Sequence, residues 1–122
     1  MARLSDKVAV ITGGAGGIGK AAGKLFAEEG AHVVLVDLNE SALKDVVQSI
    51  GDENVSYVAA DTTDPGQVQR FVNSTVERHG GIDIFIANAG IEGEVNSIID
   101  TPVDMFDKVI EVNVKGVWLG LK

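Results

Sequence analysis

The 122-residue sequence contains no cysteine, which excludes disulfide bonds and thiolate metal sites. It has no stretch approaching the roughly 18 uninterrupted apolar residues of a membrane-spanning helix, and its first residues lack the apolar core of a signal peptide. Basic residues are few, because 10 lysines and arginines stand against 18 acids for a formal net charge of −8. Nucleic acid and anionic membranes select for positive charge, so we expect neither as a partner. These absences predict a soluble, cytoplasmic protein.

Hydrophobic residues make up 45% of the sequence, a share typical of a globular protein and too high for a disordered one. The length allows one domain at most, large enough to bury a core but short for a doubly wound enzyme. No cluster of histidines and carboxylates has metal-ligand spacing, so we expect no metal site. His32 and His79 are predicted to be surface residues without partners.

The glycine-rich run Lys7–Lys20 is the most informative segment. An apolar, β-branched stretch enters it and a helix-period pattern leaves it, with five glycines between them: Gly13, Gly14, Gly16, Gly17 and Gly19. A strand, a glycine turn and a helix in this order let free N–H groups at the helix N-terminus face a phosphate, which a Cβ would hold away. The run therefore predicts a site for a nucleotide-like diphosphate.

A second apolar strand supports this interpretation. It ends in Asp37, 18 positions after Gly19, close to the spacing of about 20 expected for a carboxylate that accepts from ribose hydroxyls. Two alternatives stay open. The glycines could only let the first helix pack closely on the sheet, and Asp37 could be an ordinary helix-capping or loop acid.

The same loop also begins like a P-loop, since Gly14 to Lys20 reads Gly-x-x-x-x-Gly-Lys. The next position is Ala21, so the hydroxyl that would bind Mg²⁺ is missing. A nucleotide hydrolase is therefore only a remote alternative.

Apolar strands and amphipathic helices alternate four times along the chain. The strands are predicted at Lys7–Thr12, His32–Asp37, Val55–Asp61 and Ile82–Asn88, each mostly apolar, as expected for strands buried on both faces of a parallel sheet. Right-handed crossovers then give an α/β fold, the first half of a Rossmann-type sheet with strand order 3-2-1-4 and helices on both faces. We expect residues 1–122 to form a single, truncated dinucleotide-binding domain.

The third helix is predicted to open at the cap Asp64-Pro65, and the fourth at a similar cap, Thr101-Pro102. The fourth helix is expected to turn one stripe inward, made of Phe106, Ile110, Asn113 and Val117. It is still running at Lys122, without a glycine cap, a proline or a polar tail. We therefore expect a truncated chain that forms a homo-oligomer through its exposed fourth strand and C-terminal helix.

Four motifs, in the right order, resemble the short-chain dehydrogenase/reductase family. Thr12-Gly13-x-x-x-Gly17-x-Gly19 is similar to the family's glycine motif, and Ala87-Asn88-Ala89-Gly90 resembles its Asn-Asn-Ala-Gly signature with alanine first. Asp61 stands where the family has an Asp against the adenine ring, followed by Thr62 instead of the commoner Val. Asn113 matches the family's active-site Asn, and the resemblance covers essentially the whole chain.

The resemblance implies a role for each matching residue. Asn113 would be catalytic, by organising a helix distortion and a water of the proton relay. The alternatives are a structural Asn113 held by nearby backbone, and a plain turn at Asn88-Ala89-Gly90. Together, the glycine pattern and the resemblance give the cofactor-binding set Thr12, Gly13, Gly14, Gly16, Gly17, Ile18, Gly19, Asp37, Leu38, Asp61, Thr62, Asn88, Ala89 and Gly90.

Charge at the end of the second strand predicts NAD(H) as the cofactor. A 2′-phosphate would be repelled by Asp37 and would require a neighbouring Arg or Lys. Leu38, Gly14 and Ala15 offer no base there.

The family's catalytic Ser and its Tyr-x-x-x-Lys motif are missing from the chain. The only tyrosine is Tyr57, and Asp61 stands four residues beyond it, so Tyr57 is predicted to be a core or sheet-face aromatic. The resemblance thus implies the NAD(H)-binding N-terminal portion of an oxidoreductase that acts on an alcohol or ketone, without turnover by this chain alone. The alternative is a stand-alone NAD-binding module that forms a homo-oligomer.

Overall fold

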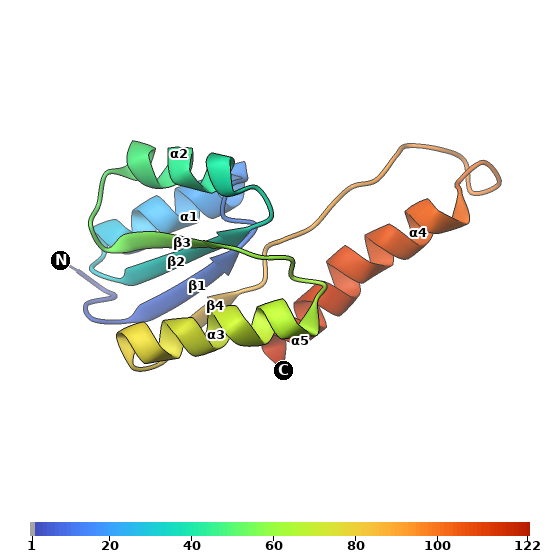
Figure 1. The fold of residues 1–122 in the computed structure, drawn as a ribbon. Helices are drawn as coiled ribbons and strands as arrows, with labels where there is room; N and C mark the ends of the chain where they lie inside the picture. The colour runs from blue at the N-terminus through green and yellow to red at the C-terminus, as the bar shows by residue number, and fades with distance from the viewer. Residues whose placement is uncertain (1) are drawn as a thin grey trace.

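The computed structural model describes residues 2–122. Its centre is a four-stranded parallel sheet in the order β3-β2-β1-β4 (Figure 1). The strands are β1 (Val8–Thr12), β2 (His32–Asp37), β3 (Val55–Ala59) and β4 (Ile84–Ile86). This confirms the predicted α/β fold and strand order. β3 and β4 are shorter than predicted, because pairing with the neighbouring strand stops at Ala59 and at Ile86.

Helices cover both faces of the sheet. α1 (Gly17–Glu28) and α2 (Glu40–Ile50) lie on one face, and α3 (Pro65–His79) and α5 (Gly116–Leu121) lie on the other. α4 (Val103–Ile110) continues through a π-helix (Glu111–Lys115) into α5 and extends away from the sheet on a long connection (Figure 1). Within residues 2–122 we find no helix with the length and apolar character needed to cross a membrane.

Two apolar clusters hold the layers together. Leu35 and Leu43 belong to the cluster under α1 and α2, and Val10 and Phe71 belong to the cluster under α3. All residues of β1 are buried, and the four inner residues of β2 are buried as well. β3 and β4 are mainly half-buried, so the prediction of strands buried on both faces is wrong for these two edge strands. Half-buried Tyr57 packs on the first cluster, as predicted for a sheet-face aromatic.

Side chains cap the helices of the central layers. Asn39 accepts from the amide of Ala42 at the start of α2, and Asp64 accepts from the amides of Gly66 and Gln67 at the start of α3. The cap at Asp64 confirms the prediction. A hydrogen bond from the Gln67 side chain, followed by the two amides, lowers the pKa of the Asp64 carboxyl.

The predicted cap at Thr101 is wrong. Pro102 occupies the N-cap position of α4 and makes no side-chain cap. The Thr101 hydroxyl donates instead to the carbonyl of Ser97 at 2.8 Å, so it is already used by the preceding turn.

The inward stripe predicted for the fourth helix is wrong for Phe106, Ile110 and Asn113, which are exposed, whereas Val117 is half-buried. Phe106 and Ile110 are 59% and 43% exposed, and α4 has no buried residue. Met105 and Val109 are the half-buried positions, because the loop before α4 crosses the helix at these residues. The sheet itself does not reach this far along the helix (Figure 1).

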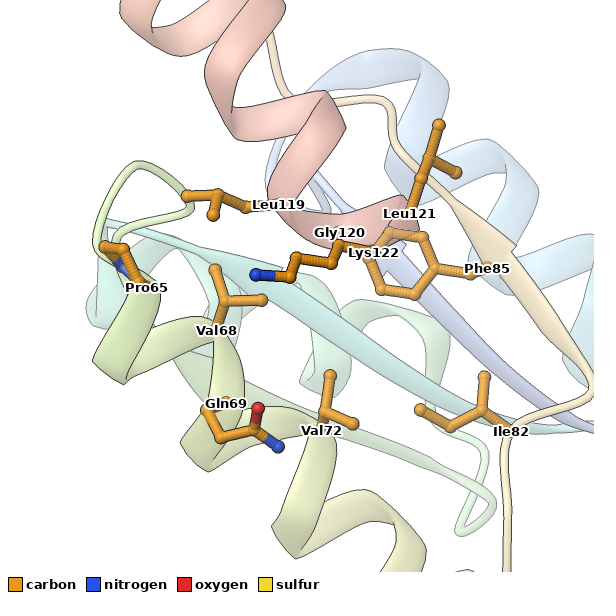
Figure 2. Close-up of a pocket in the computed structure, with 10 residues that line it drawn as sticks. All are labelled: Pro65, Val68, Gln69, Val72, Ile82, Phe85, Leu119, Gly120, Leu121 and Lys122. Atoms are coloured by element: carbon orange, nitrogen blue, oxygen red, sulfur yellow. The ribbon is translucent and has the colours of Figure 1, made fainter.

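An apolar cavity of about 460 Å³ lies between α3, β4 and α5 (Figure 2). Its walls include Val68 and Val72 of α3, Phe85 of β4 and Leu119 of α5. Nearby, Leu121 is 69% exposed and Trp118 is exposed as well. The edge strand and the last helix therefore leave apolar surface uncovered in this chain.

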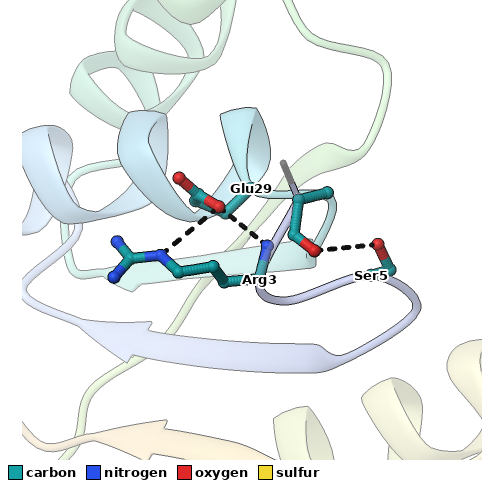
Figure 3. Close-up of polar contacts among 4 residues, drawn as sticks. Arg3, Ser5 and Glu29 are labelled. Atoms are coloured by element: carbon teal, nitrogen blue, oxygen red, sulfur yellow. Dashed lines mark hydrogen bonds and ion pairs between the residues drawn. The ribbon is translucent and has the colours of Figure 1, made fainter.

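The N-terminal segment is fastened to the end of α1 (Figure 3). The backbone N–H of Arg3 donates to the Glu29 carboxylate at 2.8 Å, and the Arg3 guanidinium lies 3.6 Å from the same oxygen. The amide hydrogen bond, followed by the Arg3 charge, lowers the pKa of Glu29.

The two histidines are not isolated, contrary to prediction. The rings of His32 and His79 are stacked, with 5.4 Å between centroids and 29° between planes. The Nε2 atom of His79 is buried and has no hydrogen-bond partner within residues 2–122. Burial, followed by the charges of Arg78 and His32, lowers the pKa of His79. The contact joins the start of β2 to the end of α3, which are far apart in the sequence.

Candidate functional site

The glycine loop leaves the carboxyl end of β1, and packing requires three of its glycines. Gly13 has a φ of +67°, which strains other residues, and a Cβ there would lie 2.9 Å from Asn88 Nδ2. A Cβ at Gly14 would lie 2.6 Å from Leu35 Cβ, and one at Gly19 would collide with the carbonyl oxygen of Gly13. The alternative interpretation, a turn that packs closely on the sheet, accounts for these three positions.

Packing does not require the other two glycines. A Cβ at Gly17 would meet no atom within 4 Å, and one at Gly16 would meet only Gly13 O, at 3.4 Å. The amides of Gly17, Ile18 and Gly19 donate to no acceptor in the described chain, and Gly16 caps α1 without a side chain. Open space over unpaired N–H groups at a helix N-terminus suits an anion.

Asp37 lies beside this loop at the end of β2. One carboxylate oxygen accepts from the amide of Ala15 at 3.0 Å, and the other accepts from the amide of Leu38 at 2.8 Å. Asp37 is therefore in part the loop acid of the alternative interpretation. Each oxygen still has capacity for a second donor. Among residues 2–122 no lysine or arginine forms an ion pair with Asp37.

A buried hydroxyl joins the glycine loop to the end of β4. Thr12 Oγ1 accepts from the amides of Asn88 at 3.0 Å and Ala89 at 3.1 Å. The side-chain amide of Asn88 then donates to the carbonyl of Gly13 at 3.4 Å. The two motifs, 75 residues apart in the sequence, thus form one edge at the carboxyl ends of β1 and β4.

Asn113 lies in the π-helix and pairs with the chain after Gly90. Its Oδ1 accepts from the amide of Ile91 at 2.7 Å, and its Nδ2 donates to the carbonyl of Ile91 at 2.8 Å. The residue is exposed, so the prediction of an amide on a buried apolar face is wrong. The backbone partner is the one expected for a structural Asn. The helix distortion that the resemblance implies is present at the same place.

Asp61 and Thr62 follow β3, and Thr62 lies against the start of α5. The carboxylate of Asp61 accepts from both the amide and the hydroxyl of Thr63, at 2.9 Å and 2.6 Å. Thr62 Oγ1 would lie 3.2 Å from a Cβ at Gly116, so the loop after β3 touches the first residue of α5.

A cavity of about 330 Å³ brings Asp61 and Leu38 together with α4. The α4 side of this cavity carries residues that the sequence reasoning missed: Asp104, Asp107, Lys108 and Glu111. Their spacing of three and four residues marks one helix face, which is the signal that could have found them. Carboxylates predominate, so this end of the site disfavours an additional phosphate.

The predicted cofactor-binding residues therefore gather along one edge of the sheet, at the last residues of β1 and β2, at the start of α1 and in the loops after the four strands, and Asn113 adjoins the loop after β4. The carboxyl edge is where open α/β sheets bind ligands. Tyr57 lies within β3, apart from these loops. In the part of the chain that the structure describes, no three His, Asp or Glu residues are placed to hold a metal ion.

Comparisons with known proteins agree with this arrangement. A family model described as short chain dehydrogenase matches residues 7–122. Short-chain dehydrogenase reductase 5 of Arabidopsis thaliana is 44% identical over 114 residues, which cover 93% of this chain and 44% of that protein. Levodione reductase of Leifsonia aquatica is 41% identical over 124 residues, covering 98% of this chain and 46% of that protein.

Solved structures give the same result. A crystal structure of levodione reductase aligns with a TM-score of 0.91 at 41% identity, covering 98% of this chain and 48% of that one. A structure of NAD+-bound xylitol dehydrogenase aligns with a TM-score of 0.91 at 34% identity, covering 98% and 46%. The chain thus spans about half the length of the curated relatives it matches.

Proposed function

The chain belongs to the short-chain dehydrogenase family of oxidoreductases, and we propose that it is the NAD(H)-binding N-terminal portion of an enzyme that acts on an alcohol or ketone. The observation that carries this proposal is the open N-terminus of α1, where the amides of Gly17, Ile18 and Gly19 have no acceptor within residues 2–122 and a Cβ at Gly17 would meet no atom within 4 Å. The residues present fit a dinucleotide, because donors and a carboxylate adjoin at the required spacing.

Each part of the cofactor has a proposed set of residues. The amides of Gly17, Ile18 and Gly19 would bind the pyrophosphate, because the helix dipole and the free N–H groups both favour negative charge. Asp37 would accept from the adenosine ribose. Asp61, Thr62 and Leu38 would contact the adenine, and Asn88 to Gly90 would contact the nicotinamide half. When bound, the nicotinamide ring supplies hydride transfer.

NAD(H) is proposed over NADP(H) on charge. Asp37 lies beside the loop and forms no ion pair with a base in residues 2–122, and the helical side of the adjoining cavity carries three carboxylates, of Asp104, Asp107 and Glu111, against one base, Lys108. A 2′-phosphate there would be repelled. In support, two of the similar structures are described with NAD+ or NADH bound, a xylitol dehydrogenase and a 3-ketoacyl-(acyl-carrier-protein) reductase from Brucella melitensis.

We expect no turnover from these 122 residues alone. The chain has no Tyr-x-x-x-Lys, and Tyr57 packs on the core instead of facing the site. A proton-transferring group would have to stand within hydrogen-bond reach of the substrate oxygen. Asn113, which holds Ile91 beside the site, would contribute to a proton relay only together with such a group.

Two further expectations belong to the proposal. Residues 1–122 would form one dinucleotide-binding domain with a cytoplasmic location. The chain would also form a homo-oligomer, since the edge of β4 and the exposed Trp118 and Leu121 leave apolar surface in water. A module that binds NAD and only oligomerises is the second candidate, and the same uncovered surface favours it. The remote P-loop alternative has no support in the family match.

Titration with NADH, followed by nicotinamide fluorescence, tests the proposal. We expect saturable enhancement with NADH and much weaker enhancement with NADPH. Absence of a signal with both coenzymes would overturn it. Incubation of the chain with secondary alcohols and NAD tests the expected lack of turnover, because turnover by this chain would contradict the expected lack of a proton-transferring group.

A further inference from the structure

The segment from Asn88 to Gly93 is anchored from two sides. Its first residues donate to Thr12 Oγ1 on β1, and Ile91 forms the reciprocal pair with the Asn113 side chain. The segment itself has no strand or helix. Its position at the edge of the sheet therefore depends on how closely it can approach the last helical segment.

Gly93 makes the closest approach. Its φ is +77°, and a Cβ there would lie 2.9 Å from Val109 Cγ2 and 3.3 Å from the sulfur of Met105. Contacts at 2.9 Å are shorter than carbon atoms tolerate, and the β-branched Val109 has one strongly preferred χ1 rotamer in a helix, so a side chain at Gly93 would push the segment away from α4.

The two contacts lie on the same side of the helix as the Asn113 pair. Met105, Val109 and Asn113 are spaced by four residues, and all three face the segment that carries Gly93 and Ile91. Moving Gly93 outward would therefore strain or open the Ile91–Asn113 pair next to it.

We propose that Gly93 is a positioning residue, which lets the segment lie close enough to α4 for Asn113 to hold Ile91 and so fix Asn88-Ala89-Gly90 beside the glycine loop. The inference rests on the proposed function in one respect, namely that this segment contacts the cofactor. Its structural part, the link between Gly93 and the Asn113 pair, stands on the geometry alone.

The variant Gly93→Ala tests this link. We expect the side-chain amide signals of Asn113 in ¹H–¹⁵N NMR spectra to move toward those of a free asparagine and to lose protection from exchange. NADH should bind roughly 3- to 10-fold more weakly, the change expected when one hydrogen bond is lost or weakened.

Gly80→Ala is the matched control for backbone strain. Gly80 has a φ of +89°, but a Cβ there would meet no atom within 4 Å. This variant should lower thermal stability without moving the Asn113 signals or the NADH affinity. Equal effects from the two variants would reduce the role of Gly93 to general strain and overturn the proposal.

A second substitution at Val109 distinguishes a steric effect of the added Cβ from a failure to fold. The double variant Gly93→Ala/Val109→Ala removes the nearest atom, so it should recover most of the Asn113 signature and the NADH affinity. Should Gly93→Ala not fold, a folded double variant with a native Asn113 signature would support the proposal, and an unfolded one would contradict it. If wild type does not bind NADH, the proposed function fails, while the Asn113 signals still decide the role of Gly93.

Discussion

The two central strands, β1 and β2, and the segment 88–110 differ in how much of their apolar surface the chain covers. β1 is fully buried and β2 nearly so, under α1 and α2 on one face and α3 on the other. α4 has no buried residue, and Val95, Ile98 and Ile99 before it are almost fully exposed. Packing therefore maintains the first region, whereas a few hydrogen bonds and one close glycine contact hold the second. Such segments open at lower free energy than a core.

The largest expected effect is on the free energy of unfolding, when one side chain from each region is truncated to alanine. Leu35→Ala in β2 removes a fully buried side chain, so we expect a loss of about 2–5 kcal/mol in the free energy of unfolding. Phe106→Ala on α4 removes a larger but mostly exposed side chain and should change the free energy of unfolding by less than about 0.5 kcal/mol. Urea unfolding followed by circular dichroism measures both, and similar losses would refute the contrast.

The expected loss of NADH affinity is larger for a residue at the end of the buried strand β2 than for one in the helix after α4. Asp37→Ala removes a carboxylate that braces the glycine loop and is proposed to hold the ribose, so NADH should bind about 10- to 100-fold more weakly. Asn113→Ala only releases Ile91, so its loss should be smaller, roughly 3- to 10-fold. Asp45→Ala on the exposed face of α2 is the charge-matched control. An unchanged affinity in Asp37→Ala would exclude Asp37 from the ribose site.

Helix caps give a smaller effect. Asn39→Ala removes the acceptor for the Ala42 amide in α2, and we expect a cost of about 1 kcal/mol. Thr101→Ala removes a hydroxyl that caps no helix and should cost less. Thermal melts of the two variants test this order, and a greater loss from Thr101→Ala would reverse it.

The smallest expected effect is on pH dependence. The pKa of His79 is lowered in the folded chain, so the unfolded chain binds the proton first as the pH falls. Stability from this group is therefore complete above the unfolded pKa, near 6.5, and declines as the pH falls below it. Urea midpoints between pH 7.5 and 5.5 should fall in wild type and fall less in His79→Gln. If the urea midpoints of wild type and His79→Gln fall in parallel, His79 contributes nothing to the pH dependence of stability.

The sequence alone correctly predicted those features of the fold that depend on local sequence patterns. Continuous apolar runs identified β1 and β2, and the cap at Asp64 identified the start of α3. The expected site residues also proved to lie along one edge of the sheet, because carboxyl ends of parallel strands meet there. Their roles in binding stay predictions.

The remaining features depend on contacts between distant segments. The inner side of α4 is set by Gly93 crossing Met105 and Val109, and no helical period encodes that contact. The stack of His32 on His79 likewise joins residues that periodicity treats separately. The strand ends of β3 and β4 depend on where a neighbouring strand stops pairing, which the apolar runs do not specify.

Few residues could replace Thr12 and keep the hydrogen bonds between β1 and the chain after β4. Its hydroxyl accepts two amides while its methyl group lies in a buried strand. Valine has the same shape but would leave the amide of Ala89 without its acceptor and the amide of Asn88 with only the carbonyl of Ile86, and alanine would leave a gap besides. A library randomised at this codon and selected for folded protein should therefore return threonine most often, with serine next because it keeps the hydroxyl and loses only the methyl group.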